Sequence, residues 1–233
     1  MSEYLTKITE CLAEIEREEG ESLAKAIRLV ADTVKNGGLI FTFGCGHSHL
    51  PGLDAFYRAG GLANVSPILD TDLMLHNGAA KSSRMEKMGG IAAEILRRYT
   101  PSKKDMIFIF SASGKNLVPI EMAEAAREVG LRSVGVSSLA YAEKGGRLHG
   151  CVDIAIDCKV PYGDACMPVG EATMGGLSTY AACFILNTCL IEGARLALSE
   201  GTLPPVYISG NVEGGREHNV TLETLYMGRV KHL

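Results

Sequence analysis

Short apolar runs alternate along this chain with segments of helical periodicity, and this alternation restricts the folds open to it more than any other feature. The runs lie at 39–43, 64–69, 105–110, 132–137 and 152–156. Strands that read as continuous apolar runs belong to parallel sheets covered by helices on both faces. The pattern therefore predicts an α/β fold, a three-layer α/β/α sandwich with a parallel sheet of about five strands and right-handed crossovers.

The helical segments are defined by apolar residues three and four positions apart. We expect helices at 3–35 (broken near Gly20), 51–60, 83–99, 117–129 and 171–198. The last of these is apolar on almost every side, which predicts a buried helix. We expect one domain over 1–233, with a helical segment at 1–36 and a tail at 204–233 that is irregular apart from a helix near 222–227.

Composition and charge exclude several classes of protein. Hydrophobic residues make up 46% of the chain and charged residues 21%, which is typical of a globular protein and not of a disordered one. The net charge of -4 includes no basic block, so we expect no nucleic-acid surface. No apolar run approaches the roughly 18 residues of a membrane-spanning helix, and we expect no membrane contact. Residues 1–21 do not have the character of a signal peptide. The chain has seven cysteines and no C-x-x-C pair, which indicates reduced thiols. We therefore expect a cytoplasmic protein.

Two loops have the composition of a phosphate site. Residues 43–49 and 110–116 each follow an apolar run, precede a helical segment and combine glycines with serines. Backbone N–H groups and hydroxyls at a helix N-terminus favour an anion. One such loop alone is also consistent with a tight turn capped by serine, but two of them favour a phosphate ligand. A dinucleotide site is disfavoured because the chain contains no G-x-G-x-x-G motif.

The same residues resemble a known family. The segment 105–116, DMIFIFSASGKN, resembles the strand and S-x-S-G-x-T signature of SIS (sugar isomerase) domains, with Asn116 in the place of threonine. Residues 44–48 resemble the G-x-G-x-S turn of that family, and 134–138 its next strand end. The resemblance covers roughly 20–200 and implies a flavodoxin-like arrangement of the sandwich. The chain is similar to single-domain phosphosugar isomerases such as phosphoheptose isomerase.

The resemblance implies a sugar phosphate as the ligand and assigns residues to it. The implied binding residues are the serines and the asparagine of the two loops with their glycines, namely Gly46, Ser48, Ser111, Ser113, Gly114 and Asn116. No cofactor is implied.

Aldose–ketose isomerisation needs a base for a carbon-bound proton and a group that moves protons between neighbouring oxygens. We expect Glu171 as the base because it begins the predicted helix 171–198, although a carboxylate there also suits the helix dipole. We expect His218, in a polar segment between glycines, to assist, although a surface turn has the same composition. Glu86 is the second choice for the base, with an exposed helical glutamate as the alternative.

A metal site is the least supported feature. Cys45, His47 and His49 alternate in the first loop and are ligand types, but a turn does not place all three side chains together. Some phosphoheptose isomerases carry zinc through histidine and glutamate, and the residues after Ser48 lack that pair. We expect no metal.

Three functions remain open from the sequence. The first is an isomerase that acts through an enediol, the second an etherase or lyase on an amino-sugar phosphate that uses Glu86 or Glu171, and the third a sugar-phosphate sensor without catalysis. Because the segment 171–198 and part of 3–35 are too apolar for one copy to cover, we also expect a homodimer or homotetramer.

Overall fold

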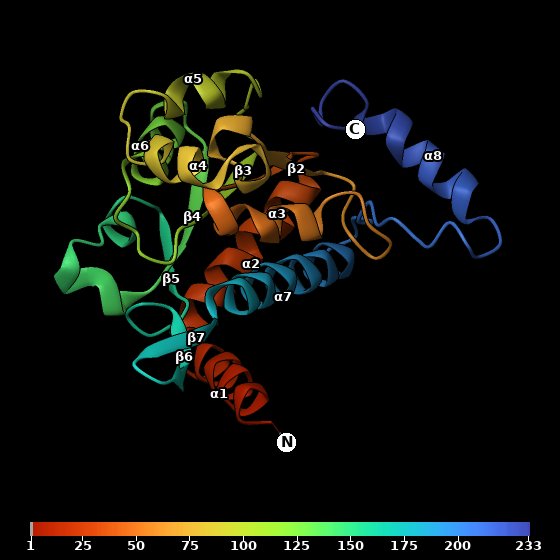
Figure 1. The fold of residues 1–233 in the computed structure, drawn as a ribbon. Coiled ribbons are helices and arrows are strands. Elements are labelled where there is room, and N and C mark those ends of the chain that lie inside the picture. The colour runs from red at the N-terminus through yellow and green to blue at the C-terminus, as the bar shows by residue number, and fades with distance from the viewer. Residues whose placement is uncertain (1) are drawn as a thin grey trace.

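A five-stranded parallel sheet forms the centre of the computed structural model, which describes residues 2–233 (Figure 1). The order of the strands is β2-β1-β3-β4-β5. This sheet, with helices on both faces, confirms the predicted α/β sandwich. The strands are β1 (Ile40–Gly44), β2 (Val65–Ile68), β3 (Met106–Phe110), β4 (Arg132–Ser137) and β5 (Ile154–Asp157).

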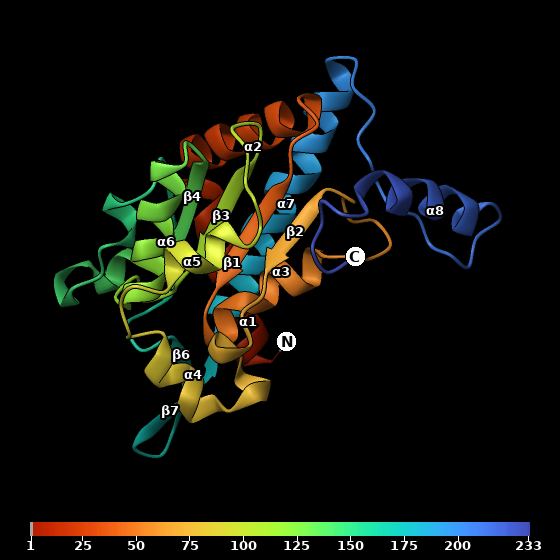
Figure 2. The same ribbon diagram turned by 90° about the horizontal axis from the view of Figure 1, so that it is seen from above.

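Helices cover the two faces of the sheet in separate layers, as the view from above shows (Figure 2). One core cluster joins the sheet to α1, α2 and α7, and the other joins it to α5 and α6. The side chains of β3 alternate between them, because successive residues of a strand point to opposite faces. The helices are α1 (Glu3–Glu18), α2 (Gly20–Lys35), α3 (Leu50–Ala55), α4 (Ala79–Met85), α5 (Ala92–Arg97), α6 (Leu117–Glu128), α7 (Ser178–Ser199) and α8 (Gly215–Tyr226).

The strand order brings the ends of β1 and β3 together at the carboxyl edge of the sheet. The two strands are hydrogen-bonded neighbours, with Gly44 opposite Phe110 at their last pair. Strand β2 lies on one side of β1 and β3 lies on the other, so the connection that follows β1 and the connection that follows β3 run in opposite directions along the sheet. A crevice opens at such a point of divergence, and ligands of open α/β sheets bind in it.

The prediction that a helix begins at Glu171 is wrong, because α7 begins at Ser178. The residues before it form an antiparallel hairpin of β6 (Ala165–Val169) and β7 (Ala172–Gly176). Its two-residue turn starts at Gly170 with φ +60°, a conformation that suits glycine and the twist of a hairpin. The glycines at the end of β7 also disfavour a helix there.

The predicted helix 83–99 is interrupted. Helix α4 ends at Met85 and α5 begins at Ala92. Gly90 between them has φ +88°, and a Cβ on Gly89 would lie 2.7 Å from the Glu121 Oε1 atom on α6. The glycine pair therefore lets the chain turn and approach α6 closely.

The C-terminal segment contains more structure than expected. Helix α8 spans Gly215–Tyr226, longer than the helix expected near 222–227. It projects from the side of the molecule beyond the end of α7 (Figure 1). The chain then returns to the body, where Val230 is buried in the same core cluster as Tyr99.

Helix α7 is long and apolar enough to cross a membrane by length and composition alone. The expectation that no apolar segment approaches that length is therefore wrong. Inside the fold, however, α7 packs closely against α2 at Gly193, where a Cβ atom would lie 2.4 Å from the Val30 Cγ1 atom. A core helix of this kind has the same length and composition as a membrane span, so the finding is weak evidence for a membrane.

Candidate functional site

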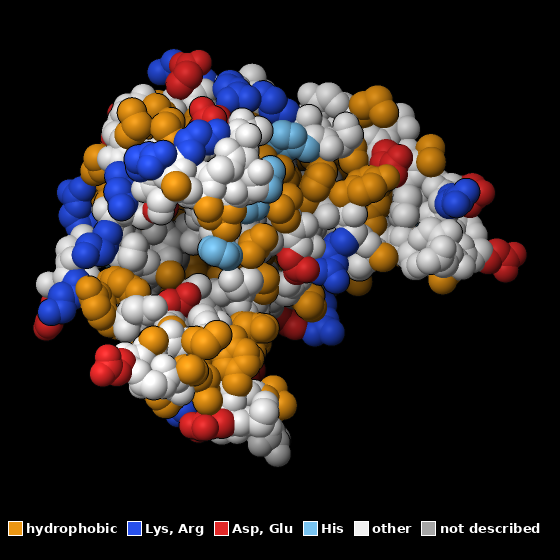
Figure 3. Space-filling model, viewed as in Figure 1, with side chains coloured by type: hydrophobic (Ala, Val, Ile, Leu, Met, Phe, Trp, Pro, Cys, Tyr) orange, Lys and Arg blue, Asp and Glu red, His pale blue; other side chains and the backbone are white. Residues whose placement is uncertain are grey.

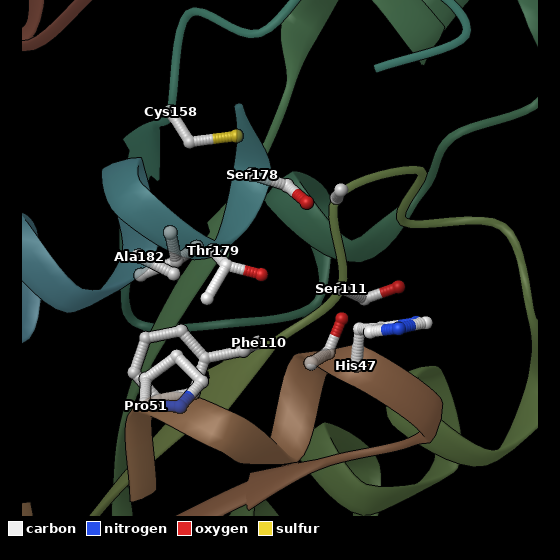
Figure 4. Close-up of a pocket in the computed structure, with 11 residues that line it drawn as sticks. His47, Pro51, Phe110, Ser111, Cys158, Ser178, Thr179 and Ala182 are labelled. Atoms are coloured by element: carbon white, nitrogen blue, oxygen red, sulfur yellow. The ribbon is translucent and has the colours of Figure 1, made fainter. Parts of the chain in front are cut away.

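A cavity of about 270 Å³ opens at the carboxyl edge of the sheet, where β1 and β3 end. A narrow recess continues from it toward α7, and His47, Ser111 and Ser178 reach this recess from three different elements (Figure 4). The polar residues that line the cavity come from both serine loops, from α4 and from segments farther along the chain: His47, Ser48, Ser82, Ser83, Glu86, Ser111, Ser113, Asn116, Tyr141, Asp164 and Ser178.

The first loop turns sharply out of β1. A Cβ on Gly44 would lie 2.1 Å from the carbonyl oxygen of Ser48, so only glycine permits this approach. Gly46 has φ +57° and begins a 3₁₀ turn, Gly46–His49. The turn places Gly46 and Ser48 on the cavity wall, where the sequence predicted them as binding residues.

The second loop follows β3 and leads into α6. Ser111 is 6% exposed, and its Oγ accepts a hydrogen bond of 3.2 Å from the backbone N–H of Gly114. Because the hydroxyl accepts this bond, its own proton remains available to a ligand. Ser113 and Asn116 also line the cavity. Gly114 does not line it, but its φ of +58° lets its N–H turn back toward Ser111.

Glu86 lies on the opposite wall of the same cavity, at the end of α4. Its backbone carbonyl accepts a hydrogen bond from Val118 N–H, and Glu121 on α6 accepts one from Gly90 N–H, so the connection 86–91 is held against α6. Burial raises the pKa of the Glu86 carboxyl, while the facing Asn116 amide acts in the opposite direction. A half-buried carboxylate of this kind is a stronger base than an exposed one.

The other two predicted catalytic residues lie outside this cavity. Glu171 occupies the exposed tip of the β6–β7 hairpin and does not line the cavity, because the predicted helix begins seven residues later. His218 lies on α8, exposed, with its Nε2 atom 2.9 Å from the carbonyl oxygen of Val206. The structure thus brings only Glu86 of the three to the serine loops.

The residues weighed as metal ligands diverge. Cys45 is buried, and burial raises the pKa of its thiol, which disfavours the thiolate that a metal requires. His49 is buried with its Nδ1 bonded to the carbonyl of Gly46, whereas His47 is exposed and lines the cavity. Within residues 2–233, no group of three histidine, cysteine, aspartate or glutamate side chains is placed to hold a metal, so these residues do not fit zinc.

Several lining residues escaped the sequence analysis. Ser82 and Ser83 lie on α4, and Tyr141 lies in a 3₁₀ helix after β4. Asp164 accepts hydrogen bonds from the N–H groups of Leu177 and Ser178 and from the Ser178 hydroxyl, and so caps α7. No motif marks these residues, since they reach the cavity through long-range packing.

Charge is distributed unevenly in the cavity. Its lining contains the carboxylates of Glu86 and Asp164 but neither lysine nor arginine among the residues that the structure describes. An anion in this cavity would be held by hydroxyls, backbone N–H groups and the N-terminal end of α6.

Comparison with known proteins places these features in context. Residues 3–138 match the SIS domain family. The UPF0309 protein of Geobacillus thermodenitrificans is 40% identical over 228 residues, which cover 94% of this chain and 92% of the relative. The solved phosphoheptose isomerase of Neisseria gonorrhoeae matches with a TM-score of 0.54 at 18% identity, covering 81% of this chain and 94% of that one. The Vibrio vulnificus NanR protein complexed with ManNAc-6P matches with a TM-score of 0.54 at 14% identity, covering 97% of this chain and 69% of that one. At these identities, the two structural matches show that this chain shares the fold of those proteins.

Proposed function

The chain belongs to the SIS domain family, and from this premise we propose that it binds a phosphorylated sugar in the cavity and interconverts its aldose and ketose forms. The observation that carries the proposal is that Glu86 lines the same cavity as both serine loops. A ligand whose phosphate lies at the loops therefore has its carbon chain within reach of one half-buried carboxylate. The similarity in fold to a phosphoheptose isomerase and to a protein that binds ManNAc-6P supports the same ligand class.

The phosphate is assigned to the loops after β1 and β3. Ser48, Ser111 and Ser113 offer hydroxyl protons there, and α6 directs the positive end of its dipole toward the same place. The Asn116 amide faces Glu86. We therefore assign two roles to this amide: it orients the Glu86 carboxylate, and it binds the ligand. Because all these donors are neutral, the loops bind the phosphate through hydrogen bonds and the helix dipole.

Isomerisation then needs two proton movements. The Glu86 carboxylate removes the proton from the carbon next to the carbonyl, which leaves an enediol, and returns it to the neighbouring carbon. The raised pKa of Glu86 suits this exchange, because a base with a pKa nearer to neutrality accepts and returns a proton efficiently. We assign the transfer between the two oxygens to His47, which lines the cavity and whose imidazole ring can donate a proton at one nitrogen and accept one at the other.

Two variants test this proposal. Ser113→Ala should weaken sugar-phosphate binding by about 1.5–3 kcal/mol, the contribution of a hydrogen bond to a charged group, whereas Ser199→Ala, outside the cavity, should not. Glu86→Gln should keep binding and lower turnover roughly 10²–10⁴-fold, with loss of deuterium incorporation from deuterated water at the carbon next to the carbonyl.

Glu171→Gln is the matched control for the base. It should leave turnover unchanged, because its side chain lies at the hairpin tip. If Glu171→Gln abolished turnover and Glu86→Gln did not, the assignment would be wrong. Binding without deuterium incorporation in the wild-type protein would contradict catalysis and favour a sensor.

A second function is favoured by the same position of Glu86. The Glu86 carboxylate on the cavity wall would also serve an etherase or lyase that acts on an amino-sugar phosphate. Removal of the same carbon-bound proton leads to loss of an ether group when one is attached at the next carbon. Release of lactate from an N-acetylmuramic acid phosphate would support elimination over isomerisation.

A further inference from the structure

We propose that His149 is a positioning residue for the phosphate loop, residues 111–116, although its side chain does not line the cavity. It holds the segment 145–150 against Gly114, and Gly114 in turn directs the Ser111 hydroxyl toward the ligand. The inference rests on the proposed function, because it concerns how the same loop binds the phosphate.

Gly114 is held by hydrogen bonds on both of its sides. Its N–H donates to the carbonyl oxygen of Ser111 at 3.0 Å and to the Ser111 Oγ atom at 3.2 Å. Its carbonyl oxygen accepts hydrogen bonds from the N–H groups of Arg147 and Leu148, at 2.8 and 3.3 Å. A glycine, here at φ +58°, has many other conformations open to it. The bonds from the segment 145–150 therefore select the conformation in which the Gly114 N–H points at Ser111.

The segment 145–150 lies at the surface and needs several attachments to keep its place. It belongs to the edge of the molecule on the side of β4 and β5, where many lysine and arginine side chains are exposed (Figure 3). Leu148 is buried in the core cluster of α5 and α6, and Arg127 on α6 donates to the carbonyl of Cys151 just after the segment. These two contacts attach the segment to the helical layer and leave its direction relative to the sheet open.

His149 supplies the attachment to the sheet. Its Nδ1 atom lies 2.6 Å from the Oγ atom of Ser137, the last residue of β4. Burial lowers the pKa of the imidazole, so the ring is neutral at pH 7 and Nδ1 can accept the Ser137 proton. Strand β4 pairs with β3 as far as Phe110, the residue before the phosphate loop. The hydrogen bond therefore fixes the segment 145–150 relative to the strand that carries the loop.

This role also accounts for the strand end at 134–138, which resembles SIS domains but leaves its two serines outside the cavity. Ser137 bonds to His149, as described above. The N–H of Ser138 donates to the carbonyl of Ala112 in the phosphate loop at 2.9 Å, and its hydroxyl donates to the carbonyl of Val160 at 2.6 Å. Both serines therefore support the loop from behind.

Titration calorimetry with inorganic phosphate tests the role of His149. His149→Leu should weaken phosphate binding about tenfold, the effect of losing one hydrogen bond to a charged group. His149→Asn should bind with nearly wild-type affinity, because its side-chain oxygen replaces Nδ1 as the acceptor for Ser137. His232→Leu is the matched control, since His232 also bonds to a hydroxyl, that of Tyr99, but outside the cavity. Wild-type affinity in His149→Leu, or equal weakening in His149→Asn, would overturn the proposal.

A double variant shows whether His149 acts through Ser111. Ser111→Ala should weaken phosphate binding about tenfold by itself. In the Ser111→Ala background, His149→Leu should add no further loss, because the hydroxyl that it positions is already absent. A general loss of structure would weaken binding in both backgrounds, so a further tenfold loss in the double variant would contradict the proposal.

Two glycine variants disturb the segment 145–150 without changing His149. A Cβ on Gly146 would lie 2.8 Å from the carbonyl oxygen of Ser113, whereas a Cβ on Gly150 would meet no other atom within 4 Å. Gly146→Ala should therefore weaken phosphate binding, and Gly150→Ala should not. Equal affinities of these two variants would show that the segment does not position the loop.

Amide hydrogen exchange of the ligand-free protein reports on the loop directly. The Gly114 N–H should exchange faster in His149→Leu than in the wild type or in His149→Asn, while the amides of β3 keep their protection. Unchanged exchange at Gly114 would overturn the proposal. If Ser113→Ala weakened phosphate binding and His149→Leu did not, this inference alone would be wrong. If the wild-type protein bound no phosphate, the proposed function would be wrong as well.

Discussion

Replacement of Gly193 by alanine tests the packing that positions α7. Gly193 lies in the interior of that helix, where glycine is normally unfavourable: alanine should stabilise an isolated helix by about 1 kcal/mol. In the fold, a Cβ at this position would lie 2.4 Å from the Val30 Cγ1 atom and 2.6 Å from the Val30 Cβ atom on α2. Val30 is fully buried, so its side chain has no free space to move into.

The expected free-energy change is the difference of two opposing terms. Carbon atoms pack at about 3.5–4.0 Å, so α2 and α7 would have to separate by roughly 1 Å. Overpacking of a core costs about 1–3 kcal/mol, and a contact this short belongs at the upper end. Subtracting the helix-propensity gain of about 1 kcal/mol leaves a loss of about 1–2 kcal/mol in the free energy of unfolding.

Urea unfolding under reducing conditions measures this loss. Gly20→Ala is the matched control, because Gly20 also lies in a helix but a Cβ there would meet no other atom within 4 Å, and this variant should be neutral or stabilising. Val30→Ala should remove the clash, so that Gly193→Ala costs less in the Val30→Ala background than in the wild type. A Gly193→Ala protein as stable as or more stable than the wild type would refute the reasoning.

Three further variants address the site and its supports. Burial raises the pKa of Glu86 and so disfavours its charged form in the folded state at pH 7, and Glu86→Gln should therefore raise the melting temperature at that pH. The difference in melting temperature between Glu86→Gln and the wild type should shrink as the pH falls through the raised pKa. A melting temperature of Glu86→Gln below that of the wild type at pH 7 would contradict this prediction. Lys159 joins the start of α2 to the end of β5, because its Nζ lies 2.9 Å from a carboxylate oxygen of Glu19 and 3.2 Å from one of Asp157. Lys159→Met should therefore lower the free energy of unfolding in urea by about 3 kcal/mol at pH 7. The loss should be smaller in acid, where the two carboxylates are neutralised. Asp164→Ala removes the cap of α7 and should cost about 1 kcal/mol, with faster amide hydrogen exchange in the first turn of α7; unchanged exchange there would show that the cap is dispensable.

Much of the architecture followed from local patterns along the chain. Strands β1 and β3 were predictable because each is a largely apolar run, bounded by glycines for β1 and by Asp105 and Ser111 for β3. A run of this kind is typical of a strand between two layers of helices. The two serine loops were predictable because glycines are needed where the backbone turns sharply after a buried strand: Gly44 and Gly46 in the first loop and Gly114 in the second. These features depend on residues that are close together in the sequence.

The choice among the glutamates depended on long-range packing. The apolar residues around Glu171 suit either a helix or a strand, and within the sequence only the neighbouring glycines favour the hairpin. Glu86 reaches the cavity because the Gly89–Gly90 pair lets its segment bond to α6, more than thirty residues later in the chain. Burial there raises the pKa of its carboxyl, and burial depends on which distant segments surround a side chain. The fold class was therefore readable from periodicity, whereas the identity of the buried carboxylate was a consequence of contacts between residues far apart in the chain.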